Sequence, residues 1–80
     1  MNETEIFEQV RNIISLELQV EPESIQFESN ANTISGWDSI SNIRIIDSLE
    51  SAFSIEFSIE AIYEANSISD LINYILLFKK

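Results

Sequence analysis

The stretch GWDSISNIRIIDSLESAF, residues 36–53, decides the fold of this chain. Asp38 is a favourable N-cap residue, and a stripe at four-residue spacing follows it: Ile45, Leu49 and Phe53. A second apolar row lies beside this stripe: Ile40, Ile43 and Ile46. We therefore predict a helix from about Ser39 to Phe53. Because its apolar arc is wide, this helix is either flanked by two other helices or presents an exposed apolar strip to a partner.

A first helix is predicted nearer the N-terminus, from about Glu3 to Leu18. Asn2 followed by Glu5 fits a capping arrangement at its start. Apolar residues recur along it at helical spacing and define one inward face: Ile6, Val10, Ile13, Ile14 and Leu18.

The periodicity fades between Gln19 and Trp37, where we expect a long loop. Pro22 is suited to begin a single helical turn through Ile25, because its fixed φ and missing N–H fit a first helical position. Gly36 breaks the chain just before Trp37. Irregularly spaced apolar residues indicate an ordered loop that is pinned to the core: Val20, Ile25, Phe27 and Ile34.

The segment after Phe53 begins with Ile55–Ile59, which alternates like a strand. A lone strand has no partner for its backbone, so we interpret this segment as an extended linker. A short helix is expected from Ser58 or Ile59 to about Ala65.

The last helix is predicted to open with a capping box, Ser67–Asp70. Its inward residues are Ile68, Leu71, Ile72 and Ile75. Lys79 and Lys80 follow at its C-terminal end, where positive charge complements the helix dipole. The fold class is therefore all-α: a four-helix bundle with three main helices, a short third helix and a long loop between helices one and two.

Composition limits the classes of function. Eighty residues suffice for one domain, expected over residues 1–80, and leave little room for an enclosed active site. Cysteine and histidine are both absent, and the formal net charge is −10. The acidic surface disfavours nucleic acid and anionic lipid, and we expect no membrane insertion. It favours partners with basic patches, although solubility alone explains the charge equally well. A cytoplasmic location is the simplest expectation.

An independent catalytic site is difficult to build from these residues. The chain has no histidine, cysteine, Gly-rich phosphate loop or calcium-binding loop, so a reactive group would have to be imported. Ser39 offers a place for one. On the first turn of a helix, free backbone N–H groups and the helix dipole stabilise a negatively charged ester. The alternative is an ordinary helix start in which Ser39 is simply a polar first-turn residue.

The wider sequence resembles the acyl carrier protein family. The resemblance rests on Gly36–Ile40, then Ile43, Ile45, Ile46, Leu49, Glu50 and Phe53, then Ile55–Phe57, Ser67–Leu71 and Ile72–Ile75. It is specific from Gly36 to Ile75 and weaker over the first helix. The family fold is a four-helix bundle with a short third helix, in agreement with the pattern above.

The resemblance implies that Ser39 is the serine that a phosphopantetheinyl transferase modifies, using coenzyme A and magnesium ion. The resulting 4'-phosphopantetheine arm ends in a thiol that carries an acyl group as a thioester. Asp38 matches the acidic residue before that serine, and Ile40 replaces the usual leucine. The function implied is a non-catalytic carrier in fatty-acid, polyketide or related biosynthesis.

Partner contacts are expected around the arm. The partners implied are the transferase and acyl-loading and acyl-processing enzymes with basic docking patches. Trp37 either packs over the loop or flanks the arm and touches partner enzymes. The candidate contact residues are Trp37, Ile40, Ile43, Arg44, Asp47, Glu50, Glu56 and Glu60.

Two of these residues depart from the family pattern. Arg44 stands where carriers of primary fatty-acid synthesis have an acidic residue, and Asp47 stands where they often have methionine. Either the two side chains pair across three residues, or they change the contact surface and so the set of partners. The second interpretation indicates a specialised carrier. We also expect the carrier to be freestanding, because the sequence begins at Met1 and ends early, after Lys80. We expect a monomer, because this state suits a shuttle and the high net charge disfavours self-association.

Two alternatives remain at this point. One is an aminoacyl or peptidyl carrier, and the other is a helical adaptor that binds proteins without being modified. The sequence does not decide whether the cargo is sheltered in the bundle.

Overall fold

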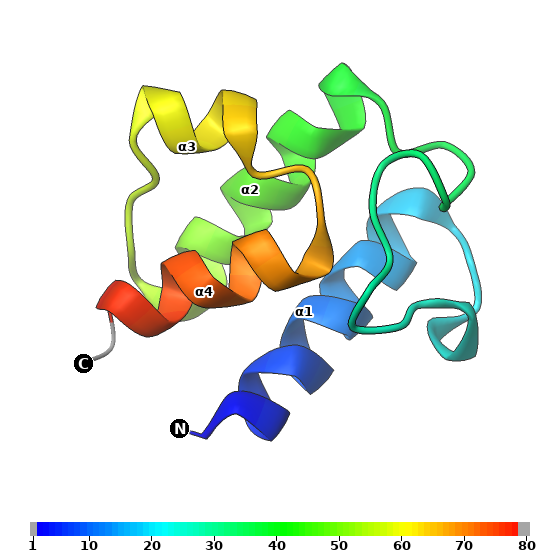
Figure 1. The fold of residues 1–80 in the computed structure, drawn as a ribbon, viewed down its shortest axis with the longest axis horizontal. Coiled ribbons are helices and arrows are strands. Elements are labelled where there is room, and N and C mark those ends of the chain that lie inside the picture. The colour runs from blue at the N-terminus through cyan, green and yellow to red at the C-terminus, as the bar shows by residue number, and fades with distance from the viewer. Residues whose placement is uncertain (1, 79–80) are drawn as a thin grey trace.

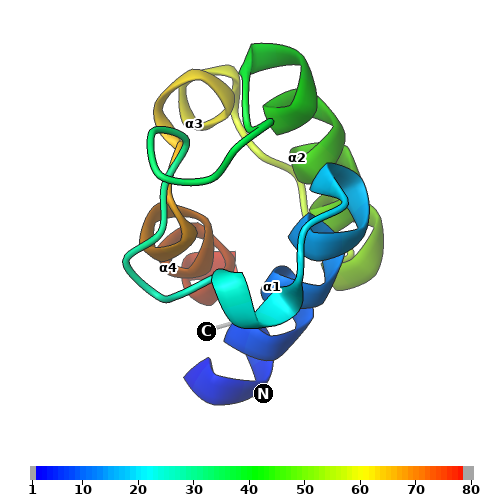
Figure 2. The same cartoon turned by 90° about the vertical axis from the view of Figure 1, so that its right-hand side faces the viewer.

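The computed structural model describes residues 2–78, and all regular elements in this range are helical. Four α-helices and one 3-10 turn follow in the order α1 (Glu3–Leu18), η1 (Pro22–Ser24), α2 (Ser39–Phe53), α3 (Ile59–Glu64) and α4 (Ile68–Phe78). Figure 2 shows the four α-helices arranged around a common centre, with the loop between α1 and α2 lying across one end. The predicted all-α fold with a short third helix is confirmed.

The predicted starts of the helices are mostly confirmed. Asn2 and Glu5 form the reciprocal capping box of α1, at 2.9 and 3.1 Å. At α4, Ser67 Oγ accepts the Asp70 N–H at 3.2 Å. Within residues 2–78 the reciprocal hydrogen bond, from the Ser67 N–H to the Asp70 carboxylate, is absent, and Ser69 Oγ lies 3.2 Å from Ser67 Oγ instead. The expectation for Lys79 and Lys80 lies outside the described residues.

The core lies between α1, α2 and α4, and α1 packs against both of the other long helices. Most of the predicted inward residues are fully buried, whereas Ile13 and Leu18 sit half-buried at its edge. Phe27, predicted to anchor the loop to the core, is exposed and instead packs against Phe7 at the surface, with ring centroids 6.2 Å apart. The side chains without exposed surface are Ile6, Val10, Ile14, Ile25, Ile45, Leu49, Ile68, Leu71, Ile72 and Ile75.

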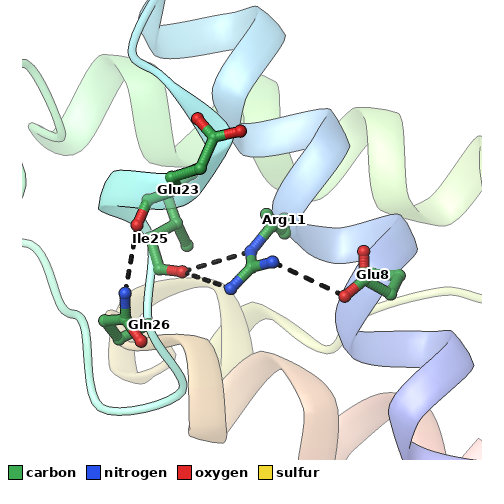
Figure 3. Close-up of polar contacts among 5 residues, drawn as sticks. All are labelled: Glu8, Arg11, Glu23, Ile25 and Gln26. Atoms are coloured by element: carbon green, nitrogen blue, oxygen red, sulfur yellow. Dashed lines mark hydrogen bonds and ion pairs between the residues drawn. The ribbon is translucent and has the colours of Figure 1, made fainter.

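The Arg11 side chain fastens the long loop to α1 (Figure 3). Its Nε and Nη2 atoms both donate to the carbonyl oxygen of Ile25, at 3.2 and 2.9 Å. The guanidinium also lies 4.5 Å from the centroid of the Phe7 ring, and Nη1 reaches Glu8 at 3.5 Å. Planar, forked guanidinium geometry suits this double contact. The loop is thereby held where Ile25 enters the core.

The middle of the same loop is attached to the start of α4. The N–H of Ala31 donates to the carbonyl of Asn66, and the N–H of Ile68 donates to the carbonyl of Ser29, both at 2.9 Å. Figure 1 shows how the loop, drawn in cyan and green, passes from the end of α1 to the start of α2. The predicted ordered loop is confirmed.

The linker between α2 and α3 is extended, as predicted, and two side chains hold it. The Glu50 carboxylate accepts the N–H of Phe57 at 2.7 Å, and the Tyr74 hydroxyl accepts the N–H of Ser58 at 2.9 Å. The rings of Phe57 and Tyr74 stack with centroids 4.5 Å apart. Ser58 then caps α3, because its Oγ accepts the Ala61 N–H at 3.1 Å.

Replacing Arg11 with alanine should destabilise the fold measurably. The substitution removes both hydrogen bonds to Ile25 and leaves that carbonyl without its charged donor. We expect the free energy of unfolding, measured by urea denaturation, to fall by about 2 kcal/mol.

The matched control is Arg44→Ala, because Arg44 is exposed and forms no ion pair within residues 2–78. Its effect should stay within about 0.5 kcal/mol. Equal losses for the two variants would show that the loop does not depend on Arg11.

Candidate functional site

Ser39 is the first residue of α2, and its side chain is exposed. Gly36, with φ of 86°, turns the end of the loop through a left-handed conformation that suits glycine best. Asp38 then adopts an extended conformation as the N-cap, and its Oδ1 accepts the Ser41 N–H at 2.9 Å. These features present the Ser39 hydroxyl at the tip of a well-formed helix.

Two opposite charges meet at the start of α2: the partial positive charge of the helix dipole and the negative charge of the Asp38 carboxylate. The N-terminal N–H groups of α2 and its dipole favour a negative group on Ser39 Oγ. The hydrogen bond from the Ser41 N–H holds the pKa of the Asp38 carboxyl below its ordinary value of 3.8. The Asp38 carboxylate is therefore charged at neutral pH beside Ser39.

Trp37 packs over the loop, since only 4% of its surface is exposed. Its indole Nε1 donates to Asn42 Oδ1 at 2.9 Å, and Asn42 Nδ2 donates to the carbonyl of Ile62 at 3.2 Å. Of the two interpretations of Trp37, the structure supports packing over direct contact with a partner surface. The sequence prediction did not include Asn42, because its partners Trp37 and Ile62 are brought near it only by tertiary packing.

A cleft of about 340 Å³ opens beside Ser39, between the N-terminal part of α2, the loop and α3. Its lining combines apolar side chains with amides: Ala31, Asn32, Trp37, Asp38, Ser39, Asn42, Ile43, Ile62, Tyr63 and Asn66. Tyr63 is 82% exposed at its rim. A flexible chain attached to Ser39 could enter this cleft without unfolding the bundle.

The second apolar row of α2 is divided between core and surface. Ile46 is buried, whereas Ile40 and Ile43 are 65% and 58% exposed. The sequence left two explanations for the wide apolar arc of α2, namely neighbouring helices or an exposed apolar strip. Both apply, because one part of the arc packs on other helices and Ile40 and Ile43 face solvent. Ile40 and Ile43 lie within four residues of Ser39 along the helix.

The charged candidates fall into two groups. Arg44, Asp47, Glu56 and Glu60 are exposed, as a contact surface requires. Glu50 is different, because its carboxylate is half-buried and holds the N–H of Phe57. Its role in the structure is to fix the linker.

Arg44 and Asp47 do not pair in the described part of the chain, where the one ion pair joins Arg11 to Glu8. The interpretation in which the two side chains satisfy each other is therefore wrong for this structure. Both side chains remain available to a partner.

Two classes of site receive no support from the described residues. Across residues 2–78, no group of three or more acidic, histidine or cysteine side chains is arranged to hold a metal ion. None of the described helices has the length and apolar character needed to cross a membrane.

Comparison with known proteins gives consistent results. The family profile described as "Phosphopantetheine attachment site" matches residues 8–75. The acyl carrier protein of Guillardia theta is 32% identical over 75 residues, which cover 94% of this chain and 93% of that protein. A solved structure of the acyl carrier protein from Enterococcus faecalis, described for its high thermal stability, has a TM-score of 0.76 at 26% identity. That match covers 96% of this chain and 98% of the solved one.

The Asp38 carboxyl should titrate below 3.8 in an NMR pH titration of the folded protein, because the Ser41 N–H stabilises its charged form. Between the lowered pKa and the ordinary one, the unfolded chain binds more protons than the folded chain. The stability that Asp38 contributes is therefore present above pH 3.8 and is lost as the pH falls through the lowered pKa. A midpoint at or above 3.8 would contradict the capping role.

Proposed function

Because the chain belongs to the acyl carrier protein family, which carries acyl groups on a covalently attached 4'-phosphopantetheine, we propose that Ser39 is the attachment residue. The observation that carries this proposal is the exposed Ser39 hydroxyl at the N-terminus of α2, on the rim of a cleft. The bound group supplies a terminal thiol, on which the acyl group is held as a thioester.

The residues around Ser39 fit such a group. Ser39 Oγ acts as the nucleophile toward the pyrophosphate of coenzyme A when a phosphopantetheinyl transferase docks. A new bond forms between Ser39 Oγ and the phosphorus atom that bears pantetheine, and the bond from this phosphorus to the bridging oxygen of the pyrophosphate breaks. Adenosine 3',5'-bisphosphate leaves with that oxygen on its 5'-phosphate, and the hydroxyl proton of Ser39 passes to a base of the transferase. The N-terminus of α2 stabilises the resulting phosphodiester, while Asp38 keeps the helix start in place.

The cleft beside Ser39 suits the rest of the arm. Asn32 and Asn66 are exposed amides on its wall, and pantetheine is itself a chain of amides. Ile43 and Ile62 provide apolar surface in the same cleft. The arm would therefore find both polar and apolar contacts within reach of its attachment point.

Delivery of the cargo requires a surface that enzymes recognise, and we place it on α2, the linker that follows it and the start of α3. Ile40 and Ile43 supply exposed apolar contact area beside Ser39, and Glu56 and Glu60 supply negative charge for basic docking patches. Within this surface Arg44 and Asp47 act in partner selection. The biosynthetic pathway, the cytoplasmic location, the monomeric state and the extent of the domain stay predictions.

Treatment with coenzyme A, magnesium ion and a broad-specificity transferase tests the attachment residue. Intact-protein mass spectrometry should show a gain of one phosphopantetheine for the unchanged protein and none for Ser39→Ala. The matched control is Ser51→Ala, an exposed serine farther along α2, which should be modified normally. Circular dichroism should show that all three proteins stay helical. An adaptor without an arm would gain no mass in any of them.

Charge reversal at Arg44 tests partner selection. The assay is turnover of the arm-bearing, acyl-loaded protein by a fatty-acid ketosynthase that has a basic docking surface. Arg44→Glu should raise kcat/KM by roughly two- to fivefold at low salt, because one repulsive contact becomes attractive. The gain should shrink at high salt through screening. Turnover of the unchanged protein equal to that of the enzyme's own carrier would argue against a specialised surface.

A further inference from the structure

A second groove lies on the other side of α3 from the Ser39 cleft. It runs between α3 and α4 and has a volume of about 490 Å³. Ile62 and Tyr63 of α3 line the cleft, whereas Glu60, Ala61 and Glu64 of the same helix line the groove. The helix α3 therefore separates two sites that face different directions.

The groove carries negative charge that the chain itself does not neutralise. Glu60 and Glu64 from α3 and Asp70 from α4 line it, and all three are exposed. Within residues 2–78 the one ion pair is Arg11 with Glu8, far from this groove in the sequence. Holding three carboxylates around one groove costs electrostatic energy, and a positively charged occupant would relieve it.

The rest of the lining is mixed, because it combines Ala61, Ala65, Tyr74 and Leu77 with the polar residues Ser58 and Asn73. Ala61 and Ala65 leave room between the two helices, and Leu77 is 66% exposed on the wall that α4 contributes. Small residues on one side and a large exposed one on the other allow the side chains of a visiting helix to interdigitate. The groove therefore combines an apolar surface with an acidic rim.

We propose that the groove between α3 and α4 is a docking site for a basic amphipathic helix of a partner protein. Leucine-like side chains of that helix pack on Ala61 and Leu77, and its lysine or arginine residues meet Glu60, Glu64 and Asp70. A second copy of this chain does not fit, because its net charge of −10 would be repelled. Phosphate-bearing ligands are disfavoured by the same carboxylates.

This site is independent of the arm. Ser39 is not part of the groove lining, so binding of the helix does not require modification of Ser39. A partner bound at the groove would leave Ser39, Ile40 and Ile43 free, and it would share only Glu60 with the surface proposed for the enzymes that visit the arm. Such an arrangement would keep the carrier close to a particular complex and raise its effective concentration there.

A synthetic peptide tests the proposal with the full chain. The probe is an amphipathic leucine–lysine helix of about 14 residues, long enough to span α4, whose 11 residues extend about 16 Å. A scrambled peptide of the same composition has the same charge without an apolar face. NMR titration should move the backbone amides of Ala61, Ala65 and Asn73 with the amphipathic peptide, and binding of the scrambled peptide should be clearly weaker.

Variants locate the binding energy. Glu60→Gln with Glu64→Gln and Asp70→Asn should weaken binding about tenfold at low salt, since three exposed charge contacts are lost. Leu77→Ser should also weaken binding of the peptide, because it removes the apolar side chain on which the leucine residues of the peptide pack. Each variant has a matched control outside the groove. Leu16→Ser, at a leucine on α1 that is 80% exposed, is the control for Leu77→Ser. The control for the triple charge removal is a second triple change at exposed loop residues: Glu21→Gln, Glu23→Gln and Glu28→Gln. Figure 1 shows the first part of this loop, drawn in cyan, on the opposite side of the molecule from α3.

The controls should alter the dissociation constant by no more than about twofold. Equal weakening by the loop variants, equal affinity for the scrambled peptide, or shift changes centred on α2 would overturn the proposal. Self-association of the unchanged chain through α3 and α4 in analytical ultracentrifugation would also overturn it. The Ser39→Ala variant should bind the peptide as the unchanged protein does, so failure of this proposal and failure of Ser39 attachment are distinguished.

Discussion

The side chain of Asn42 connects the three segments that surround Ser39. It accepts the indole N–H of Trp37 from the loop and donates to the carbonyl of Ile62 in α3, while its own backbone belongs to α2. These polar atoms lie at the edge of an apolar core. Removing the Asn42 amide would leave the indole N–H of Trp37 and the carbonyl of Ile62 without this hydrogen-bond partner. Each buried group left unpaired lowers the free energy of unfolding by about 1–3 kcal/mol. The shape of the cleft beside Ser39 therefore depends on this amide.

The helix α3 depends on such polar contacts because it has little core of its own. None of its six residues, all of which the structure describes, is buried. The Tyr74 hydroxyl holds the N–H of Ser58 at its start, and Asn42 holds the carbonyl of Ile62 near its end. Two side chains from the long helices thus place a short helix between the cleft and the groove. Because no residue of α3 is buried, one side of the helix can line the cleft beside Ser39 and the other side can line the groove.

The positions of the helices were predictable because they follow from periodicity and capping. The predicted bounds of α1 and α2 agree with the structure, and the N-cap roles of Asn2 and Asp38 follow from their side chains. The contacts of Arg11, Asn42 and Glu50 were not predictable in this way. Each joins a side chain to backbone or side-chain atoms that tertiary packing brings near, and such contacts leave no periodic pattern in the sequence. For the same reason the position of Ser39 followed from the sequence, whereas the cleft beside it did not.

The central claim is that one hydroxyl at the tip of α2 carries the arm. Tandem mass spectrometry of proteolytic fragments from the transferase-treated protein tests it most directly, because it assigns the modification to an individual residue. The account predicts that the phosphopantetheine mass lies on the fragment containing Ser39 and localises to that side chain. Modification at a different serine, with Ser39 unmodified, would contradict it.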